Sequence, residues 1–482
     1  MKQTRQRVVL YNPRAVFYTM PLALVALASA LDRAKVDVVI VDGRLESDPI
    51  GRVLEATDGA LCLGVSVLTG APIHDALAIS RAVKTRRPHC CIVWGGWHPS
   101  LFAGECLEDP AIDVAVIGQG EDTFKEIVER LAGGESICGC PGTMVKGTES
   151  RGPWTVGRGQ SEATGPGRPL RDLNEFPRHD YSLIPVERYF ALKQKRQIDY
   201  ISSQGCRFRC AFCADPAVYS RGWTGLAPER IADETAMLAR QHGIEEVAFQ
   251  DETFFTHPAR IDALADELLR RDVSVAWTAT LRADQACRMG EPLFIKSIRA
   301  GLRRVMIGVE SGSQTTLDRL KKDMRLDQVM AAADMCARHD VGVIFNFIVG
   351  FPGESEDSVN QTLALAKRLR GMHPRFETPI FYYRPYPGNP IADDARAAGY
   401  VFPRGLEAWA NFDYVAGRGP WITDARWREV ERFKFYTRHA WQPGAWRWPL
   451  RAASRWRCDR DWYAFPVEKA LIEFMRPPQQ VS

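Results

Sequence analysis

The chain of 482 residues has no apolar run long enough to cross a membrane. A spanning helix needs about 18 or more consecutive apolar residues with few charges. A secretory signal peptide is also missing, because residues 2–7, Lys-Gln-Thr-Arg-Gln-Arg, lead into a short β-like run rather than a long apolar one. The net charge of +4 is too small over this length to indicate nucleic-acid binding. We therefore expect a cytoplasmic protein that does not bind nucleic acid.

Two common nucleotide-binding motifs are absent as well. No Gly-x-Gly-x-x-Gly follows the first apolar run and no Walker lysine motif occurs, which argues against a nucleotide-phosphate site. What the amino-terminal region does contain is short apolar runs that alternate with helical stretches. The runs are residues 7–13, 36–42, 59–67, 90–96 and 114–118. Continuous apolar strands of this kind predict a buried parallel sheet in an α/β, Rossmann-like, doubly wound domain.

Small and polar residues follow the carboxyl ends of these runs. Ligands bind doubly wound sheets beyond those ends, and glycine lets a ligand approach the backbone closely. We therefore expect a ligand site in the loops after the third, fourth and fifth runs. Its candidate residues are Ser66, Thr69, Gly95, Gly96, His98, Gly118, Gly120 and Glu121.

Three of the 12 cysteines stand close together in the octet Cys-Arg-Phe-Arg-Cys-Ala-Phe-Cys of residues 206–213. Cys206, Cys210 and Cys213 have the spacing C-x3-C-x2-C, and three thiolates can hold a [4Fe–4S] cluster while one iron stays open. A zinc site or buried free thiols are the alternatives. Zinc needs a fourth Cys or His at short spacing, and none occurs between Cys213 and His242. The octet therefore favours an iron–sulfur site.

The octet resembles the signature of the radical S-adenosylmethionine (SAM) superfamily, including the aromatic Phe212 before the last cysteine. The resemblance implies that the three cysteines bind the cluster and that SAM chelates the open iron. It further implies SAM-binding groups at the ends of later strands, namely Asp251 and Glu252 for the methionine ammonium, Glu310 and Ser311 for the ribose and methionine portions, and Asn346 and Gly350 beside adenine. Taken singly, these segments also fit helix caps and turns. The implied fold is a partial (β/α)6 barrel of the TIM type.

Residues 7 to 131 resemble the cobalamin-binding domain that precedes the barrel in many radical SAM enzymes. The resemblance rests on the Ser/Thr, Gly-Gly-x-His-Pro and Gly-x-Gly-Glu segments, which in that family surround the corrinoid. The Asp-x-His-x-x-Gly motif that supplies a lower histidine ligand to cobalt is missing, since no histidine occurs before His74. We expect His98 to shape its loop rather than to ligate cobalt.

These features divide the chain into four parts. We expect a cobalamin-binding Rossmann-like domain at 1–140, a linker at 141–190, a radical SAM barrel at 191–390 and a helical domain at 391–482. The last part is rich in Trp and Arg. Its aromatic residues fit a helical domain that closes the barrel, and contact with a membrane is the less favoured interpretation because basic and acidic residues are mixed.

Together the resemblances imply a methyltransferase that uses a [4Fe–4S] cluster, SAM and cobalamin. The cluster would cleave SAM to a 5'-deoxyadenosyl radical, which abstracts hydrogen from an unactivated carbon, and methylcobalamin would deliver the methyl group. The substrate would be a small molecule, and the electrons would come from a flavodoxin or ferredoxin. One alternative is an oxidative cyclase or ring-rearranging enzyme with the same cofactors. Another is a corrinoid and cluster sensor without turnover. The sequence does not identify the substrate, the lower cobalt ligand or the oligomeric state.

Overall fold

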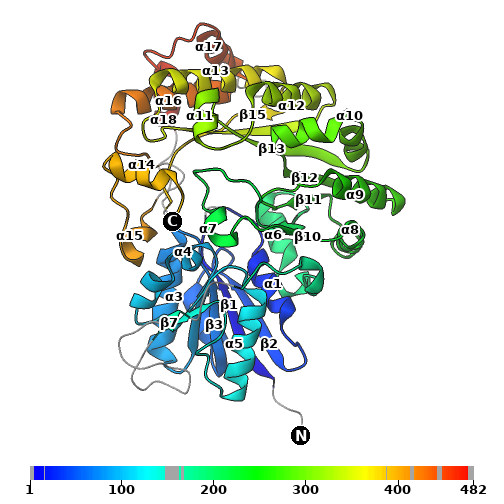
Figure 1. The fold of residues 1–482 in the computed structure, drawn as a ribbon, viewed down its shortest axis with the longest axis vertical. Coiled ribbons are helices and arrows are strands. Elements are labelled where there is room, and N and C mark those ends of the chain that lie inside the picture. The colour runs from blue at the N-terminus through cyan, green and yellow to red at the C-terminus, as the bar shows by residue number, and fades with distance from the viewer. Residues whose placement is uncertain are drawn as a thin grey trace.

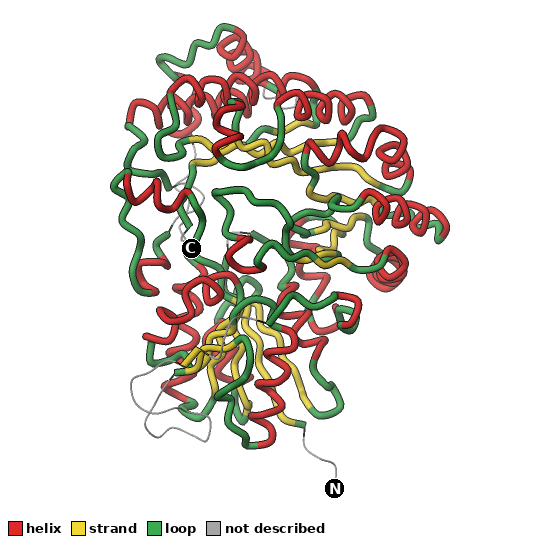
Figure 2. Tube along the Cα trace, in the orientation of Figure 1, coloured by secondary structure: helices red, strands yellow, loops and turns green. Residues whose placement is uncertain are grey.

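A computed structural model describes residues 5–15, 17–146, 162–163, 168–386, 388–412, 417–441 and 448–475. Most of residues 141–170 of the expected linker therefore lies outside the described residues. Most strands gather into two seven-stranded sheets, one in each half of the molecule (Figure 2), and one further pair of strands forms a small sheet of its own. The amino-terminal half holds the first sheet, and the second sheet lies above it in Figure 1.

The first sheet has seven strands in the order β2-β1-β3-β4-β5-β6-β7, and the pairs from β2 through to β5 are parallel. Its strands are β1 (Gln6–Asn12), β2 (Val36–Asp42), β3 (Ala60–Ser66), β4 (Cys91–Gly95), β5 (Val114–Val116), β6 (Thr143–Val145) and β7 (Glu162–Ala163). The helices are α1 (Leu22–Ala30), α2 (Pro49–Ala56), α3 (Pro72–Arg86), α4 (Trp97–Glu108) and α5 (Glu121–Gly133). The expected Rossmann-like fold is confirmed. Antiparallel pairing by β6 and β7 extends this sheet past residue 140.

Both faces of this sheet are covered because its strands are apolar on both sides. Helices α1 and α5 pack on one face, where Phe124 and Leu24 join a buried cluster with Val93. Helices α2, α3 and α4 cover the other face, where Val53 and Ile73 lie in a second cluster. The strand order turns back between β1 and β3, so the carboxyl ends of β1 and β3 border the kind of crevice in which such sheets bind ligands.

The second sheet is an open barrel of parallel strands, as expected. Its order is β15-β14-β13-β12-β11-β8, and β16 pairs with β14 beyond β15, so the last strand is interrupted. The strands are β8 (Gln197–Tyr200), β11 (Glu246–Phe249), β12 (Ala276–Thr280), β13 (Leu302–Glu310), β14 (Gly342–Val349), β15 (Phe376–Glu377) and β16 (Ile380–Tyr382). The helices between them are α8 (Pro228–His242), α9 (Pro258–Arg270), α10 (Ala283–Arg299), α11 (Gln314–Arg319), α12 (Leu326–Arg338) and α13 (Glu356–Met372).

Short elements connect the two halves. They are η1 (Leu173–Glu175), η2 (Tyr181–Leu183), α6 (Val186–Lys193), β9 (Ser203–Gln204), α7 (Asp215–Tyr219) and β10 (Thr224–Gly225). Helix α7 lies between the two sheets in Figure 1 and contacts α4 of the first domain. The segment that begins at the octet cysteines is thus placed directly against the amino-terminal domain.

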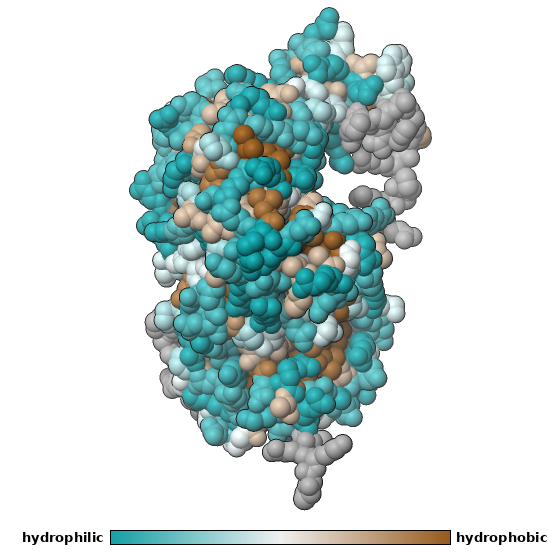
Figure 3. All heavy atoms as spheres, turned by 90° about the vertical axis from the view of Figure 1, so that its right-hand side faces the viewer, coloured by the Kyte–Doolittle hydropathy of each residue, from teal (hydrophilic) through white to brown (hydrophobic). Residues whose placement is uncertain are grey.

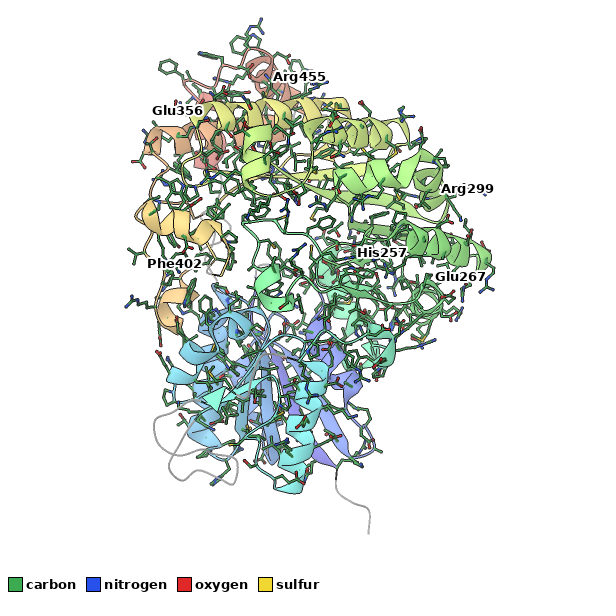
Figure 4. All side chains as sticks on the ribbon, viewed as in Figure 1. His257, Glu267, Arg299, Glu356, Phe402 and Arg455 are labelled. Carbon is green, nitrogen blue, oxygen red and sulfur yellow. The ribbon has the colours of Figure 1, made fainter. Side chains whose placement is uncertain are left out.

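The carboxyl-terminal helices pack against two different parts of the molecule. They are α14 (Ile391–Ala397), α15 (Leu406–Ala410), α16 (Asp424–Ala440), α17 (Trp448–Asp459) and α18 (Val467–Met475). Helix α15 reaches back to the first domain, where Trp409 is buried in the cluster under α3 and α4. Phe402, in the connection to α15, packs against the same cluster (Figure 4). Helices α16 and α17 instead pack against each other, and α16 also contacts α13, in the upper part of Figure 1.

The outer surface is mainly hydrophilic on the side drawn in Figure 3, with a few hydrophobic patches. Among the described residues, none of the helices combines the length and the apolar character that crossing a bilayer requires.

Candidate functional site

The three octet cysteines lie on the loop after β8 and β9, at the carboxyl end of the barrel's first strand. A buried carboxylate holds the start of this loop. Asp251, at the end of β11, accepts hydrogen bonds from the Ser202 amide at 2.7 Å, from the Ser202 hydroxyl at 2.6 Å and from the Ser203 hydroxyl at 2.6 Å. Arg260 donates to the Ser202 carbonyl at 2.8 Å. The Asp251 carboxylate therefore accepts its hydrogen bonds from the protein and stabilises the start of the cysteine loop.

The thiols of Cys206, Cys210 and Cys213 are half-buried neighbours. Burial raises the pKa of Cys206 to about 11 and that of Cys213 to about 12, so these groups are thiols until a metal ion displaces the protons. The Asp215 amide donates to the Cys213 sulfur at 3.5 Å, and the Arg282 guanidinium lies 3.8 Å from the Cys210 sulfur. In the described parts of the chain, no group of three or more Cys, His, Asp or Glu side chains is arranged so that it could hold a single metal ion.

The residues expected near SAM at the ends of β13 and β14 have mixed environments. Glu310 has a positive φ of 69° and forms a buried ion pair with Lys322 at 2.7 Å. Ser311 is fully buried and its hydroxyl lies 3.1 Å from that of Thr362, so it is used inside the protein. The ring of Phe212 packs 6.1 Å from that of Phe351. These contacts stiffen the rim of the barrel beside the cysteine loop.

Asn346 and Gly350 belong to β14 and the turn after it. Asn346 alternates with the buried Phe345 and Phe347, so its side chain points to the inside of the open barrel. Gly350 has a φ of 77°, which favours glycine, and its carbonyl accepts a hydrogen bond from the Trp421 indole at 2.8 Å. The turn is thus fastened to the carboxyl-terminal region.

A cavity of about 260 Å³ lies between the first domain and the barrel. It enters the space between the first sheet and helices α1 and α5, where Gly64, Val93 and Phe124 form its walls. Six of the eight residues predicted for the amino-terminal ligand site line it, namely Ser66, Gly95, Gly96, Gly118, Gly120 and Glu121. Gly96 and Gly118 have φ values of 99° and 75°, which a residue with a side chain adopts only under strain.

The barrel contributes the other wall of this cavity. Glu252, which follows Asp251, opens into it together with Ser203, Gln204 and Tyr219. Burial among protein atoms raises the pKa of Glu252 to about 8 and also raises the pKa of Glu121. A cation bound in the cavity would favour the ionised form of either carboxylate. The cavity therefore joins residues that are far apart in the sequence into one site.

Sequence reasoning missed several lining residues. Tyr219, on α7, was not singled out, although it lies only six positions after the last octet cysteine. His179 comes from the connecting segment and also lines the cavity, and burial lowers its pKa to about 4. Trp97 lines the cavity too, and it occupies the variable position of the Gly-Gly-x-His-Pro segment. A single sequence gives no signal that these three residues meet.

Thr69 and His98 are near the cavity but pack behind it. His98 is fully buried, its Nδ1 lies 3.2 Å from the Thr69 hydroxyl, and its ring stands 5.0 Å from that of Phe102 and 6.1 Å from that of Trp409. Its surroundings are therefore those of a residue that shapes the loop and receives α15. Burial lowers the pKa of His98 to about 4, so the imidazole is neutral at pH 7.

This buried histidine predicts a loss of stability in mild acid. The pKa of His98 is near 4 when folded and about 6.5 when unfolded. The unfolded state therefore takes up a proton first as the pH falls below about 6.5. We expect this group alone to lower the free energy of unfolding by about 2 kcal/mol between pH 7 and pH 5.

In His98→Gln the midpoint of thermal unfolding should fall less over this range than in the wild type, whereas the exposed control His89→Gln should behave as the wild type. Equal slopes for His98→Gln and the wild type would contradict this.

Comparisons with known proteins match each half of the molecule to a protein family. The family model of the radical SAM superfamily matches residues 200–366, which contain the octet, and the B12 binding domain model matches residues 10–128, which contain the amino-terminal wall of the cavity. The chain is a radical SAM enzyme with a B12-binding domain. The predicted [4Fe–4S] cluster, SAM and cobalamin are the cofactors of these two domains.

Relatives of this radical SAM enzyme include methyltransferases and a cyclase. An uncharacterized methyltransferase of Pyrococcus horikoshii is 28% identical over 403 residues, which cover 82% of each chain. The anaerobic magnesium-protoporphyrin IX monomethyl ester cyclase of Rubrivivax gelatinosus is 25% identical over 69% of this chain and 59% of the cyclase. The structure of the radical SAM methyltransferase TsrM from Kitasatospora setae superposes with a TM-score of 0.68 at 19% identity, over 82% of this chain and 78% of TsrM, and so has the same fold.

The residues present fit the three cofactors. The donor set on the cysteine loop consists of three thiols with a cationic guanidinium beside them, which suits an anionic iron–sulfur cluster with one open iron. The cavity has a glycine-lined mouth and an apolar inner wall, which suits a large ligand with a buried tail. Neither Thr69 nor His98 lines the space that cobalamin would fill.

Proposed function

We propose that this enzyme transfers a methyl group to an unactivated carbon of a small molecule. The observation that supports this most is the shared cavity, which places residues of the B12-binding domain opposite the segment that carries the octet cysteines. A reaction that needs both cofactors at one substrate requires such an arrangement. The methyltransferase relatives agree with it.

We assign the following roles to the chain's own residues. When bound, the cluster and SAM supply a 5'-deoxyadenosyl radical, and cobalamin supplies the methyl group. Cys206, Cys210 and Cys213 would hold the cluster, and Asp251 would keep their loop in place. Glu252 would receive the methionine ammonium of SAM, since it is the carboxylate of its pair that opens into the cavity. The glycines at the ends of β4 and β5 would let cobalamin reach the backbone.

We further propose an acidic electron donor of the flavodoxin or ferredoxin type. Arg207, Arg209 and Arg221 are exposed on or beside the cysteine loop. Arg209 pairs with Asp323 at 2.7 Å, and the other two have no carboxylate partner among the described residues. A basic surface next to the cluster would steer an acidic donor to it. Contact of the carboxyl-terminal Trp/Arg segment with a membrane is the less favoured alternative.

Tracing the SAM methyl group tests the proposal against its alternatives. The purified, cobalamin-loaded enzyme would be incubated anaerobically with methyl-deuterated SAM, a reductant and pools of small molecules fractionated from cells. A methyltransferase forms 5'-deoxyadenosine and S-adenosylhomocysteine and moves the label into a product. A radical cyclase, which the cyclase relatives favour as second candidate, forms 5'-deoxyadenosine without label transfer. If neither SAM-derived product forms, both enzyme functions are wrong and the sensor interpretation gains.

A further inference from the structure

A chain of four polar groups crosses the junction of the two domains and ends at the cavity. The Arg171 amide donates to the Oε1 of Gln119 at 2.9 Å. The Nε2 of Gln119 donates to the Oε1 of Gln204 at 2.8 Å, and the Nε2 of Gln204 donates to the Tyr219 hydroxyl at 3.2 Å. Gln119 lies in the loop before α5, whereas Gln204 and Tyr219 flank the cysteine octet. These hydrogen bonds therefore join the expected cobalamin-binding loops to the segment that carries the octet cysteines.

The direction of this chain is determined by its first member. A backbone amide can only donate, so Gln119 must turn its oxygen toward Arg171 and its nitrogen toward Gln204. Gln204 must then accept with its oxygen and donate with its nitrogen. The Tyr219 oxygen receives that donation, which leaves the hydroxyl proton free to be given to another acceptor.

The free hydroxyl proton of Tyr219 belongs to a residue that lines the cavity. Among the described residues, no protein group accepts a hydrogen bond from it. The ring is held edge-on against Trp97 of the first domain, with centroids 6.1 Å apart and planes at 87°. The hydrogen bond from Gln204 and the contact with Trp97 fix the orientation of the phenol. Because buried polar groups are normally hydrogen-bonded, its remaining proton needs an acceptor in the cavity.

We propose that Tyr219 donates this hydrogen bond to an oxygen of bound cobalamin, either a corrin amide carbonyl or the phosphate of the nucleotide tail. The proposal rests on the cobalamin use described above. Tyr219 is then a positioning residue. It stands six positions after Cys213, so a bond from its hydroxyl fixes cobalamin relative to the cluster loop. Loss of the bond should therefore loosen cobalamin without removing iron.

The direct test is cobalamin affinity in Tyr219→Phe. Titration of the cluster-loaded protein with hydroxocobalamin, followed by absorbance after equilibrium dialysis, should show affinity about fivefold to tenfold weaker than wild type. The control is Tyr436→Phe, which removes a buried phenol that bonds Glu468 at 2.8 Å, in the carboxyl-terminal region. Its cobalamin affinity should equal that of the wild type. Wild-type affinity in Tyr219→Phe would overturn the proposal.

Cobinamide separates the two acceptors, because it keeps the corrin amides and lacks the phosphate tail. If Tyr219→Phe weakens cobinamide as much as cobalamin, the acceptor is a corrin amide. If it weakens cobalamin alone, the acceptor is in the nucleotide tail. If the wild type binds no corrinoid at all, the proposed function fails, which is distinct from a wild type that binds and a variant that binds equally well.

A second variant tests the direction of the chain and keeps the tyrosine ring in place. In Gln204→Glu the new carboxylate can only accept, so Tyr219 should turn its proton toward residue 204 and lose the bond to cobalamin. We expect a similar fivefold to tenfold loss, about the value of one hydrogen bond, and no further loss in the double variant with Tyr219→Phe. If the two losses of cobalamin affinity multiply in the double variant, the new charge acts independently of Tyr219, and the proposed direction of the hydrogen bonds is wrong. Unchanged cobalamin affinity in Gln204→Glu would also overturn it. Iron content and thermal unfolding identify a misfolded variant, and if Tyr219→Phe misfolds, Gln204→Glu decides.

Discussion

Replacing Cys206 by alanine should lower 5'-deoxyadenosine formation at least about a hundredfold and strip iron from the protein. Cys206 stands first in the octet and shares its loop with Cys210 and Cys213. Two thiolates cannot hold a cluster that also keeps an open iron for SAM. Iron and sulfide analysis after reconstitution, together with chromatography of SAM products, measures both effects. Cobalamin binding should persist, because the cysteine lies outside the cavity lining.

The matched control for this prediction is Cys287→Ala. Cys287 is the exposed cysteine on α10, outside the octet, and its sulfur lies 3.8 Å from the Gln328 carbonyl. This variant should retain the iron content and product formation of the wild type. If Cys206→Ala kept its iron, the cluster would have to be held elsewhere and the assignment of the octet would be wrong.

Filling the cavity should separate the two cofactors. Ser66 ends β3 and faces the cavity, so a phenyl ring in Ser66→Phe would occupy part of its volume of about 260 Å³. Forcing a large group into occupied space costs about 1 to 3 kcal/mol, which corresponds to a roughly fivefold to 150-fold weaker cobalamin affinity. The cluster should remain, and at limiting cobalamin the variant should still form 5'-deoxyadenosine while transferring much less methyl label than the wild type. Cobalt, iron and product analysis on one sample would show this.

Ser136→Phe is the control for added bulk. Ser136 is exposed in the turn after α5, where its hydroxyl accepts from the Cys138 amide at 3.2 Å. Its cobalt content should match that of the wild type. Full cobalt occupancy in Ser66→Phe would place cobalamin outside this cavity, and simultaneous loss of iron and cobalt would mean that the two sites do not fold independently.

Local patterns carried much of the fold. Apolar runs of strand length alternating with amphipathic helices are a short-range property, and they predicted both parallel sheets. The octet was equally recognisable, since its three cysteines lie within eight residues of one another. Six of the eight residues inferred from loop positions after the strands reached the cavity, because parallel strands deliver their carboxyl ends to one edge.

Long-range packing decided the rest. Asp251 and Glu252 are neighbours with the same charge, yet one is enclosed by Ser202 and Ser203 and the other opens into the cavity. A strand end turns consecutive side chains in opposite directions, and only the neighbouring elements determine what each side chain meets. His98 likewise became a packing residue once α15 brought Trp409 back against it.

The sequence by itself determined the two domain types and the class of chemistry and singled out the cysteine octet, because each depends on residues that are close along the chain. The tertiary structure alone decided that the two domains share one cavity and that Gln119, Gln204 and Tyr219 are hydrogen-bonded in a row at the junction of the domains. Such contacts depend on how the domains dock, which is set by burial of surfaces far apart in sequence. No local pattern encodes that docking.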